Sequence, residues 1–227
     1  MLRKITNTKK SLTLRSISRL GWSLSLVMLT LGLLKTEAPA QDAQAILQRG
    51  KAYYDSNNTT DQAAIEFSVV IKKYRGSAEA ESAQYYLASY YQRKFYIINR
   101  TKGIEDKNSL VKAKTEYAAY TRDYFKQGAT WLSDAFFNLA LVYFQMGDSQ
   151  RAVWELNKMS QYASMDSQVY IYEVVWSPDS GDVIDGYYPA QQLAEFVKAN
   201  SQRSFPDLVN ATKRWLRASQ LKKQQLK

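Results

Sequence analysis

The sequence predicts an all-α protein built from repeated helical hairpins, and one stretch shows the unit most clearly. In FFNLALVYFQMGDSQRAVWEL, Phe136–Leu156, apolar residues recur with the period of a helix on both sides of Gly147. Gly147 can adopt the left-handed conformation that ends a helix, and Asp148 or Ser149 can cap the next one. Because the turn is short, the two helices must lie antiparallel, with Ala140 or Ala152 allowing their backbones to approach closely.

The hairpin recurs along the chain. AAIEFSVVIKKY (Ala63–Tyr74) aligns with AKTEYAAYTRDY (Ala113–Tyr124), and AQYYLASYY (Ala83–Tyr91) aligns with AFFNLALVY (Ala135–Tyr143). A helix pair of this kind cannot bury its apolar face alone, so neighbouring copies are expected to stack on one another. The second hairpin is stretched, and we expect a loop between its helices at Thr101–Asn108.

The spacing resembles the tetratricopeptide repeat (TPR) family, whose pattern is W-x2-L-G-x2-Y, then A-x3-F, then P. The third hairpin fits without a gap, and the first two fit in part. The matching positions are Ile46, Gly50, Tyr53, Ala63 and Phe67 in the first hairpin, Leu87, Ala88, Tyr91, Ala113 and Tyr117 in the second, and Phe136, Leu139, Ala140, Tyr143, Ala152 and Leu156 in the third. The resemblance implies a right-handed α-α superhelix of about three hairpins over residues 41–162, with the consensus aromatic residues in its core.

The stretch IKKYRGSAEAESAQYYLASYY, residues 71–91, narrows the resemblance. It is similar to a segment of bacterial cell-envelope TPR proteins, of the types found as the periplasmic coordinator of the Tol-Pal system and as the TPR lipoprotein of the outer-membrane assembly machine. The chain lacks the N-terminal coiled coil of the first type and the lipid-modified cysteine of the second. The resemblance implies an exported scaffold that binds a protein of the envelope, without catalysis and without a cofactor.

Residues 1–40 have the pattern of an export signal. A basic segment without acids precedes the apolar run Leu20–Leu34, and Ala38 and Ala40 supply the small residues of a cleavage site before Gln41. We expect cleavage after Ala40 and a mature chain that is periplasmic or secreted. The alternative is an uncleaved anchor in the inner membrane, but the apolar run would span only about 22 Å of a hydrocarbon core of roughly 30 Å.

Charge and composition narrow the possible functions. Residues 1–40 hold 7 of the 31 basic residues and 1 of the 21 acidic ones, so 24 bases and 20 acids remain and the net charge falls from +10 to +4. This small charge argues against a nucleic-acid partner. The chain has no cysteine and no histidine, which excludes Ser-His-Asp and Cys-His catalysis and zinc sites built on those residues. The remaining enzyme alternative is a cell-wall hydrolase that uses Glu66 and Glu116 as paired carboxylates.

Residues 163–227 form a C-terminal extension with a different pattern. Residues typical of strands at Gln168–Trp176 and Val183–Tyr188 flank the turn SPDSGD, which favours a short β-hairpin over a fourth, irregular helical unit. Pro189 and Pro206 can each open a helix in its first turn. The second of these helices suits the polar cap that the end of a solenoid needs.

Two charged features of the extension have alternative interpretations. Asp179, Asp182 and Asp185 could ligate calcium, but they lack the spacing of a calcium loop, and a solvated turn is the simpler interpretation. The acid-free basic tail is the cationic end of a capping helix or, alternatively, a weak contact for anionic lipid or cell-wall polymer. Its basic residues are Lys213, Arg214, Arg217, Lys222, Lys223 and Lys227.

In the TPR family the first helix of each hairpin lines a concave groove, and its outward positions contact the partner. The positions that the resemblance implies here are Lys51, Tyr54, Tyr85, Ser89, Gln92, Arg93, Phe137, Leu141 and Phe144. Lys51 and Arg93 are expected to give specificity, because a cation can pair with an acidic side chain or a C-terminal carboxylate of the partner. For any single aromatic ring of this set, packing between helices is the favoured interpretation, and contact with a partner is the alternative.

Overall fold

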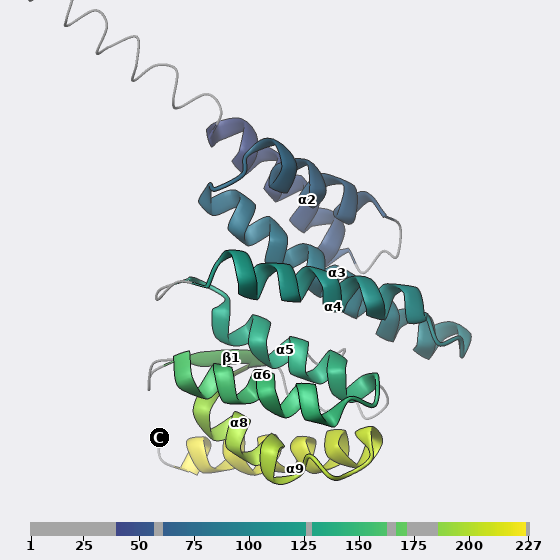
Figure 1. Cartoon of the computed structure of the whole chain (residues 1–227), viewed down its shortest axis with the longest axis vertical. Coiled ribbons are helices and arrows are strands. Elements are labelled where there is room, and N and C mark those ends of the chain that lie inside the picture. The colour runs from purple at the N-terminus through teal and green to yellow at the C-terminus, as the bar shows by residue number, and fades with distance from the viewer. Residues whose placement is uncertain (1–39, 57–60, 126–128, 163–166, 172–185, 226–227) are drawn as a thin grey trace, which may run out of the picture. The chain divides into compact units, whose positions relative to one another are not determined.

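The computed structural model describes residues 40–56, 61–125, 129–162, 167–171 and 186–225 (Figure 1). Within these residues the chain is mostly helical, with eight helices and two short strands, so the predicted all-α class is confirmed. Residues Ala43–Lys227 form one compact unit.

The helices follow one another along the chain, and each packs against the next. The first described helix covers residues 40–55. It is followed by α2 (Gln62–Lys73), α3 (Ala78–Lys102), α4 (Lys107–Asp123), α5 (Leu132–Gln145) and α6 (Ser149–Tyr162). From α2 to α6, every helix contacts its neighbour in sequence, as Figure 1 shows. The helices expected between Ala43 and Tyr162 are therefore present.

The turn between α5 and α6 forms as the sequence predicts. Gly147 has a φ of 79°, and the N–H of Asp148 donates to the carbonyl of Tyr143 at 2.9 Å, which closes α5. The side chain of Asp148 then accepts the N–H of Arg151 at 3.0 Å and caps the start of α6. One short stretch thus ends one helix and begins the next.

The pair α3 and α4 is the longest, with helices of 25 and 17 residues. Gly103, at a φ of 63°, ends α3, and Asp106 caps α4 by accepting the N–H of Ser109 at 3.2 Å. The loop between the two helices therefore covers residues 103–106, inside the range expected from the sequence.

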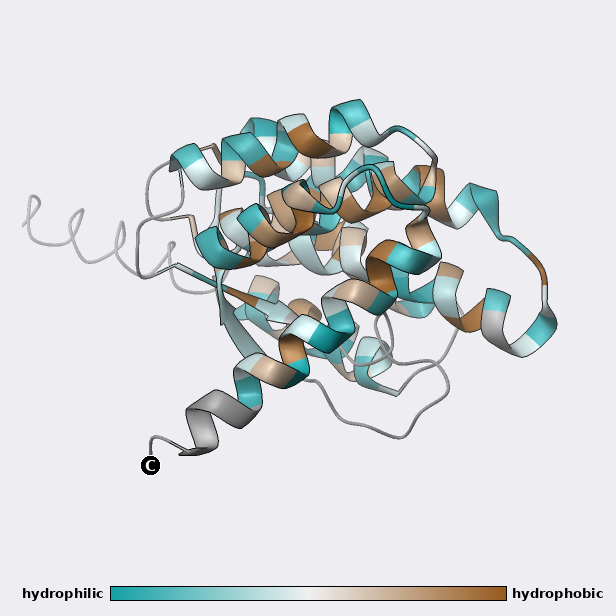
Figure 2. Ribbon diagram, turned by 90° about the horizontal axis from the view of Figure 1, so that it is seen from below, coloured by the Kyte–Doolittle hydropathy of each residue, from teal (hydrophilic) through white to brown (hydrophobic). Residues whose placement is uncertain are grey.

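Two clusters of buried apolar side chains hold the helices together. One joins the first helix to α2 and α3 around Phe67, and the other joins α3–α6 to the C-terminal elements around Phe136. Ala140 and Ala152, the small residues expected between α5 and α6, are fully buried. Hydrophobic and hydrophilic residues alternate in short runs along the helices (Figure 2), as in helices that bury one face.

Tyr53 departs from its expected place in the core, because its side chain is 40% exposed. Phe67 and Tyr117 are fully buried, and Tyr91 and Tyr143 are half-buried. The first helix turns a different face inward, and its buried residues are Ala43, Leu47, Gly50 and Tyr54. The expectation for Tyr53 was wrong because the first helix packs against α2 and α3 through the face that carries Leu47 and Tyr54, and Tyr53 lies outside that face.

In the C-terminal extension, β1 (Gln168–Ile171) pairs antiparallel with β2 (Gly186–Pro189). Val169 lies opposite Tyr188 in this ladder, and both side chains are buried. The expected turn SPDSGD, and with it the three aspartates considered as calcium ligands, lies outside the described residues.

The chain ends in two helices that begin at the predicted prolines. α8 (Ala190–Ala199) starts directly after Pro189, and α9 (Phe205–Gln225) has Pro206 in its first turn. Trp215 of α9 stacks on Phe196 of α8 with 5.2 Å between ring centroids. α9 therefore packs against α8 through an aromatic pair.

Candidate partner-binding surface

The structure buries most of the side chains that the sequence places toward a partner. Seven of the nine are 5% exposed or less, namely Tyr54, Tyr85, Ser89, Gln92, Phe137, Leu141 and Phe144. The expectation that these seven side chains face solvent is wrong. Only Lys51 and Arg93 remain half-exposed.

On α3, neighbouring elements cover the expected positions. Tyr85 stacks on Trp131, which precedes α5, with 5.0 Å between ring centroids. Gln92 points toward α4 and accepts a hydrogen bond from the hydroxyl of Tyr117 at 2.9 Å. This face of α3 is therefore used for packing inside the chain.

Ser89 and Tyr54 lie on different helices and bury each other's hydroxyl groups. The Tyr54 hydroxyl and Ser89 Oγ are 2.8 Å apart and share a buried hydrogen bond. Because Tyr54 lies on the first helix and Ser89 on α3, this bond fixes the two helices together. The ring of Tyr54 packs between helices, which is the favoured one of the two interpretations considered for the aromatic residues of this set.

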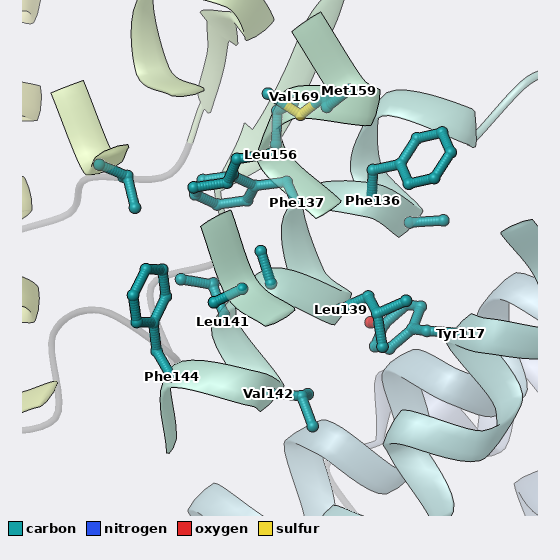
Figure 3. Packing of buried hydrophobic residues seen from close by; sticks show 14 of the residues in the cluster. Tyr117, Phe136, Phe137, Leu139, Leu141, Val142, Phe144, Leu156, Met159 and Val169 are labelled. Carbon is teal, nitrogen blue, oxygen red and sulfur yellow. The ribbon is translucent and has the colours of Figure 1, made fainter. Parts of the chain in front are cut away.

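On α5, the expected positions belong to the main core cluster. Phe137 and Leu141 share this cluster with Leu156 of α6 and Val169 of β1, as Figure 3 shows. β1 packs against α5, so an element of the C-terminal extension lies on the helix that was expected to be open to a partner. The repeat pattern alone does not predict that β1 packs on this face of α5.

Lys51 and Arg93 are each held against an aromatic ring. The Lys51 Nζ lies 4.6 Å from the centroid of the Tyr86 ring, and the Arg93 guanidinium carbon lies 4.7 Å from that of Tyr54. The two rings meet edge to face at 5.6 Å. The two cation-to-ring distances are within the range of a cation–π interaction. The two cations are therefore positioned by a pair of rings that contact each other.

Tyr86 is the residue at this site that the sequence reasoning missed. It is half-exposed, whereas its neighbour Tyr85 is buried. Burial raises the pKa of the Tyr86 hydroxyl, with smaller contributions from Asp55 and from Tyr187 of β2. Tyr187 is 55% exposed and close enough to act on Tyr86 electrostatically. We call the side chains of Lys51, Tyr86, Arg93 and Tyr187 the Lys51–Arg93 surface.

Among the described residues, the Lys51–Arg93 surface carries two cations against one nearby carboxylate, Asp55, and this excess of positive charge favours an anionic group. Burial also raises the pKa of Tyr54, so both tyrosines beneath the cations are neutral at physiological pH. Within the described part of the chain, neither Lys51 nor Arg93 forms a salt bridge with a carboxylate. Their positive charges therefore remain available to a ligand.

Asp134 is a second feature that the sequence reasoning did not single out. It lies in the first turn of α5, is only 5% exposed, and its Oδ1 accepts the backbone N–H of Tyr170 in β1 at 2.8 Å. Burial raises the pKa of Asp134 to about 7, although the backbone hydrogen bonds that it accepts act in the opposite direction. An acid among apolar residues in WLSDAFF is the sequence signal for such a group.

The two glutamates of the hydrolase alternative lie in separate interactions. Glu66 pairs with Arg49 at 3.2 Å, and Glu116 accepts a hydrogen bond from Gln84 at 2.7 Å. Among the described residues no three acidic, histidine or cysteine side chains gather as metal ligands would. The helices in those residues are also too short or too polar to cross a lipid bilayer.

Comparison of the chain with protein-family models, with curated proteins and with solved structures finds no match.

Proposed function

We propose that the chain is an exported, periplasmic scaffold of the TPR type that binds a partner protein of the cell envelope through the Lys51–Arg93 surface. The export signal at residues 1–40 supports the location. The recurring helix pairs and the spacing of their small and aromatic residues support the TPR assignment, including its superhelical arrangement.

The observation that carries this proposal is the fixed position of two half-exposed cations on neighbouring rings. A long cationic side chain usually loses rotamer freedom on binding, and that loss weakens the interaction. At this surface Tyr86 and Tyr54 already restrict Lys51 and Arg93, so less freedom is lost when a ligand binds. The preferred ligand group is a carboxylate, either an acidic side chain or the C-terminus of the partner.

The aromatic rings would supply the apolar part of the interaction. Tyr86 and Tyr187 are large, have few rotatable bonds and present both apolar and polar atoms, which is why tyrosine is common at binding sites. A partner segment with an acidic group next to an apolar or aromatic residue would fit this combination. Recognition would then need no chemistry by the scaffold.

The test is cross-linking in intact cells, followed by identification of the captured protein. Lys51→Glu and Tyr86→Ala are expected to lose capture of an envelope protein. Lys51→Glu reverses the charge at position 51, and Tyr86→Ala removes the ring that holds the Lys51 side chain in place. Lys112→Glu is the matched control, since the Lys112 Nζ lies 5.0 Å over the ring of Tyr91, another cation–π pair. Equal capture by all three variants, or no envelope protein captured by the unaltered chain, would reject the proposal.

A further inference from the structure

β1 lies on the face of α5 that carries the expected partner-contacting residues. Val169 is fully buried in the same cluster as Phe137, and the N–H of Tyr170 donates to the Asp134 carboxylate at 2.8 Å. A buried side chain and a backbone N–H of the strand are therefore both held by the helix. These are the two kinds of contact by which proteins hold an extended peptide.

The ladder of β1 with β2 is too short to hold β1 in place alone. It pairs only four residues on each strand, from Gln168 opposite Pro189 to Ile171 opposite Gly186. A two-stranded sheet of this size is marginally stable in water. The position of β1 therefore depends on α5 and on the adjoining hydrogen bond from the Ala190 N–H to the Ser167 carbonyl, 2.9 Å long.

Among Gln168–Tyr170, the residues of β1 whose burial is described, the middle one alone is fully buried. Gln168 is exposed, Val169 is buried and Tyr170 is half-buried. Alternate burial lets a strand be recognised through every second side chain, while its backbone is held by a neighbour. On α5 the neighbour is Asp134, whose side chain takes the place of a backbone acceptor.

We propose that this face of α5, which carries Asp134 and Phe137, is a receptor for an extended strand that β1 fills within the chain and that a strand of the partner can fill in its place. The competing strand would carry a β-branched residue at the buried position and a free backbone N–H at the next one. This inference rests on the proposed function, because it describes how the same scaffold takes a partner segment.

The receptor face and the Lys51–Arg93 surface are connected through the strand pair. Tyr188 of β2 lies opposite Val169 of β1, and Tyr187, which precedes Tyr188, lies opposite Tyr170 with 4.9 Å between the two ring centroids. Displacement of β1 would therefore remove the Tyr170 ring from Tyr187, which belongs to the Lys51–Arg93 surface. A partner strand that takes the place of β1 on α5 would also change the packing of Tyr187 at the second contact.

The test uses the full chain and a fluorescein-labelled peptide with the sequence SQVYI, residues 167–171, followed by fluorescence anisotropy. Val169→Asp should release the chain's own strand, because it buries a charge. It is expected to bind the peptide roughly tenfold more tightly than the unaltered chain. Gln168→Asp places the same charge at the exposed neighbouring position and should bind like the unaltered chain. Equal binding by all three chains, or no binding by Val169→Asp, overturns the proposal.

Hydrogen exchange provides a second measurement in case Val169→Asp loses its helical circular dichroism. Addition of excess peptide to the unaltered chain should speed exchange of the Tyr170 amide, since the peptide displaces β1 from Asp134. Unchanged exchange of that amide at the highest peptide concentration overturns the proposal. Neither measurement needs the envelope partner, so failure here is distinct from failure of the proposed function.

Discussion

A Cβ atom added to Gly50 would lie 2.7 Å from Cε1 and 2.8 Å from Cδ1 of the Phe67 ring. Gly50 is on the first helix and Phe67 on α2, so the lack of a side chain at Gly50 lets these two helices approach closely. Phe67 is fully buried, and at the packing density of a protein interior its neighbours resist a shift of its ring.

Gly50→Ala is therefore expected to destabilise the chain, although alanine favours a helix more than glycine does. Overpacking of a core costs about 1–3 kcal/mol, against a gain in helix propensity of about 1 kcal/mol or less. Urea unfolding followed by circular dichroism measures the difference. Gln48→Ala, at an exposed position of the same helix, is the control and should be near neutral. A Gly50→Ala chain more stable than the control would show that the helices can separate.

Asp134 is expected to make the stability of the chain depend on pH. Its pKa is about 7 in the folded chain and 3.8 ordinarily, so folding favours the protonated form. The resulting stabilisation is complete below about pH 4 and is lost as the pH rises toward 7. Between pH 5 and pH 8 the loss is on the order of a few kcal/mol.

Asp134→Asn should remove this dependence, because its amide oxygen can still accept the Tyr170 N–H but cannot ionise. Thermal unfolding at pH 5 and pH 8 is the measurement, with Glu105→Gln as a control at an exposed loop position. Burial also raises the pKa of Glu155, so some dependence of the same sign should remain in Asp134→Asn. If the unaltered chain and Asp134→Asn lose the same stability between the two pH values, Asp134 is not the responsible group.

The helices and turns could be predicted from the sequence because their signals are local. The period of the apolar residues marks α5 and α6, and Gly147 with Asp148 marks the turn between them. The start of α8 after Pro189 follows from the fixed backbone angle of proline. Each of these features depends on residues within one or two turns of the chain.

The candidate site could be predicted only in part because exposure depends on distant segments. Tyr85 and Tyr86 are adjacent, and a helix places them about 100° apart, so the repeat pattern alone does not decide which one faces solvent. The structure decides it through Trp131, which stacks on Tyr85 and lies outside the repeat pattern. On α5, Val169 covers Phe137 from the C-terminal extension, which the repeat pattern does not include.

If residues 1–40 act as an export signal, the mature chain begins at Gln41. Mass spectrometry of the protein from its native cells should find that N-terminus, since Ala38 and Ala40 supply the small residues before the cleavage site. Ala40→Asp is the control variant, because a charged residue at that position should block cleavage. An N-terminus at Met1 in the unaltered protein would favour the alternative of a membrane-anchored subunit.

Arg93 is expected to contribute to stability as well as to binding. Its Nη1 donates to the carbonyl of Tyr54 at 2.9 Å, in the last turn of the first helix, where a cation also interacts favourably with the helix dipole. Arg93→Ala should therefore lower the free energy of unfolding by about 1–2 kcal/mol, from the lost hydrogen bond and cation–π interaction. Lys51→Ala should reduce partner capture with little change in stability.

Urea unfolding separates the two roles. Lys94→Ala is the matched control, because Lys94 is adjacent and pairs at 2.7 Å with Asp61, whose side chain is exposed, and a pair with one exposed partner contributes about 1 kcal/mol. Should Arg93→Ala prove no less stable than Lys94→Ala, the bond to Tyr54 would not secure the first helix. Arg93 would then serve binding alone, as Lys51 is proposed to do.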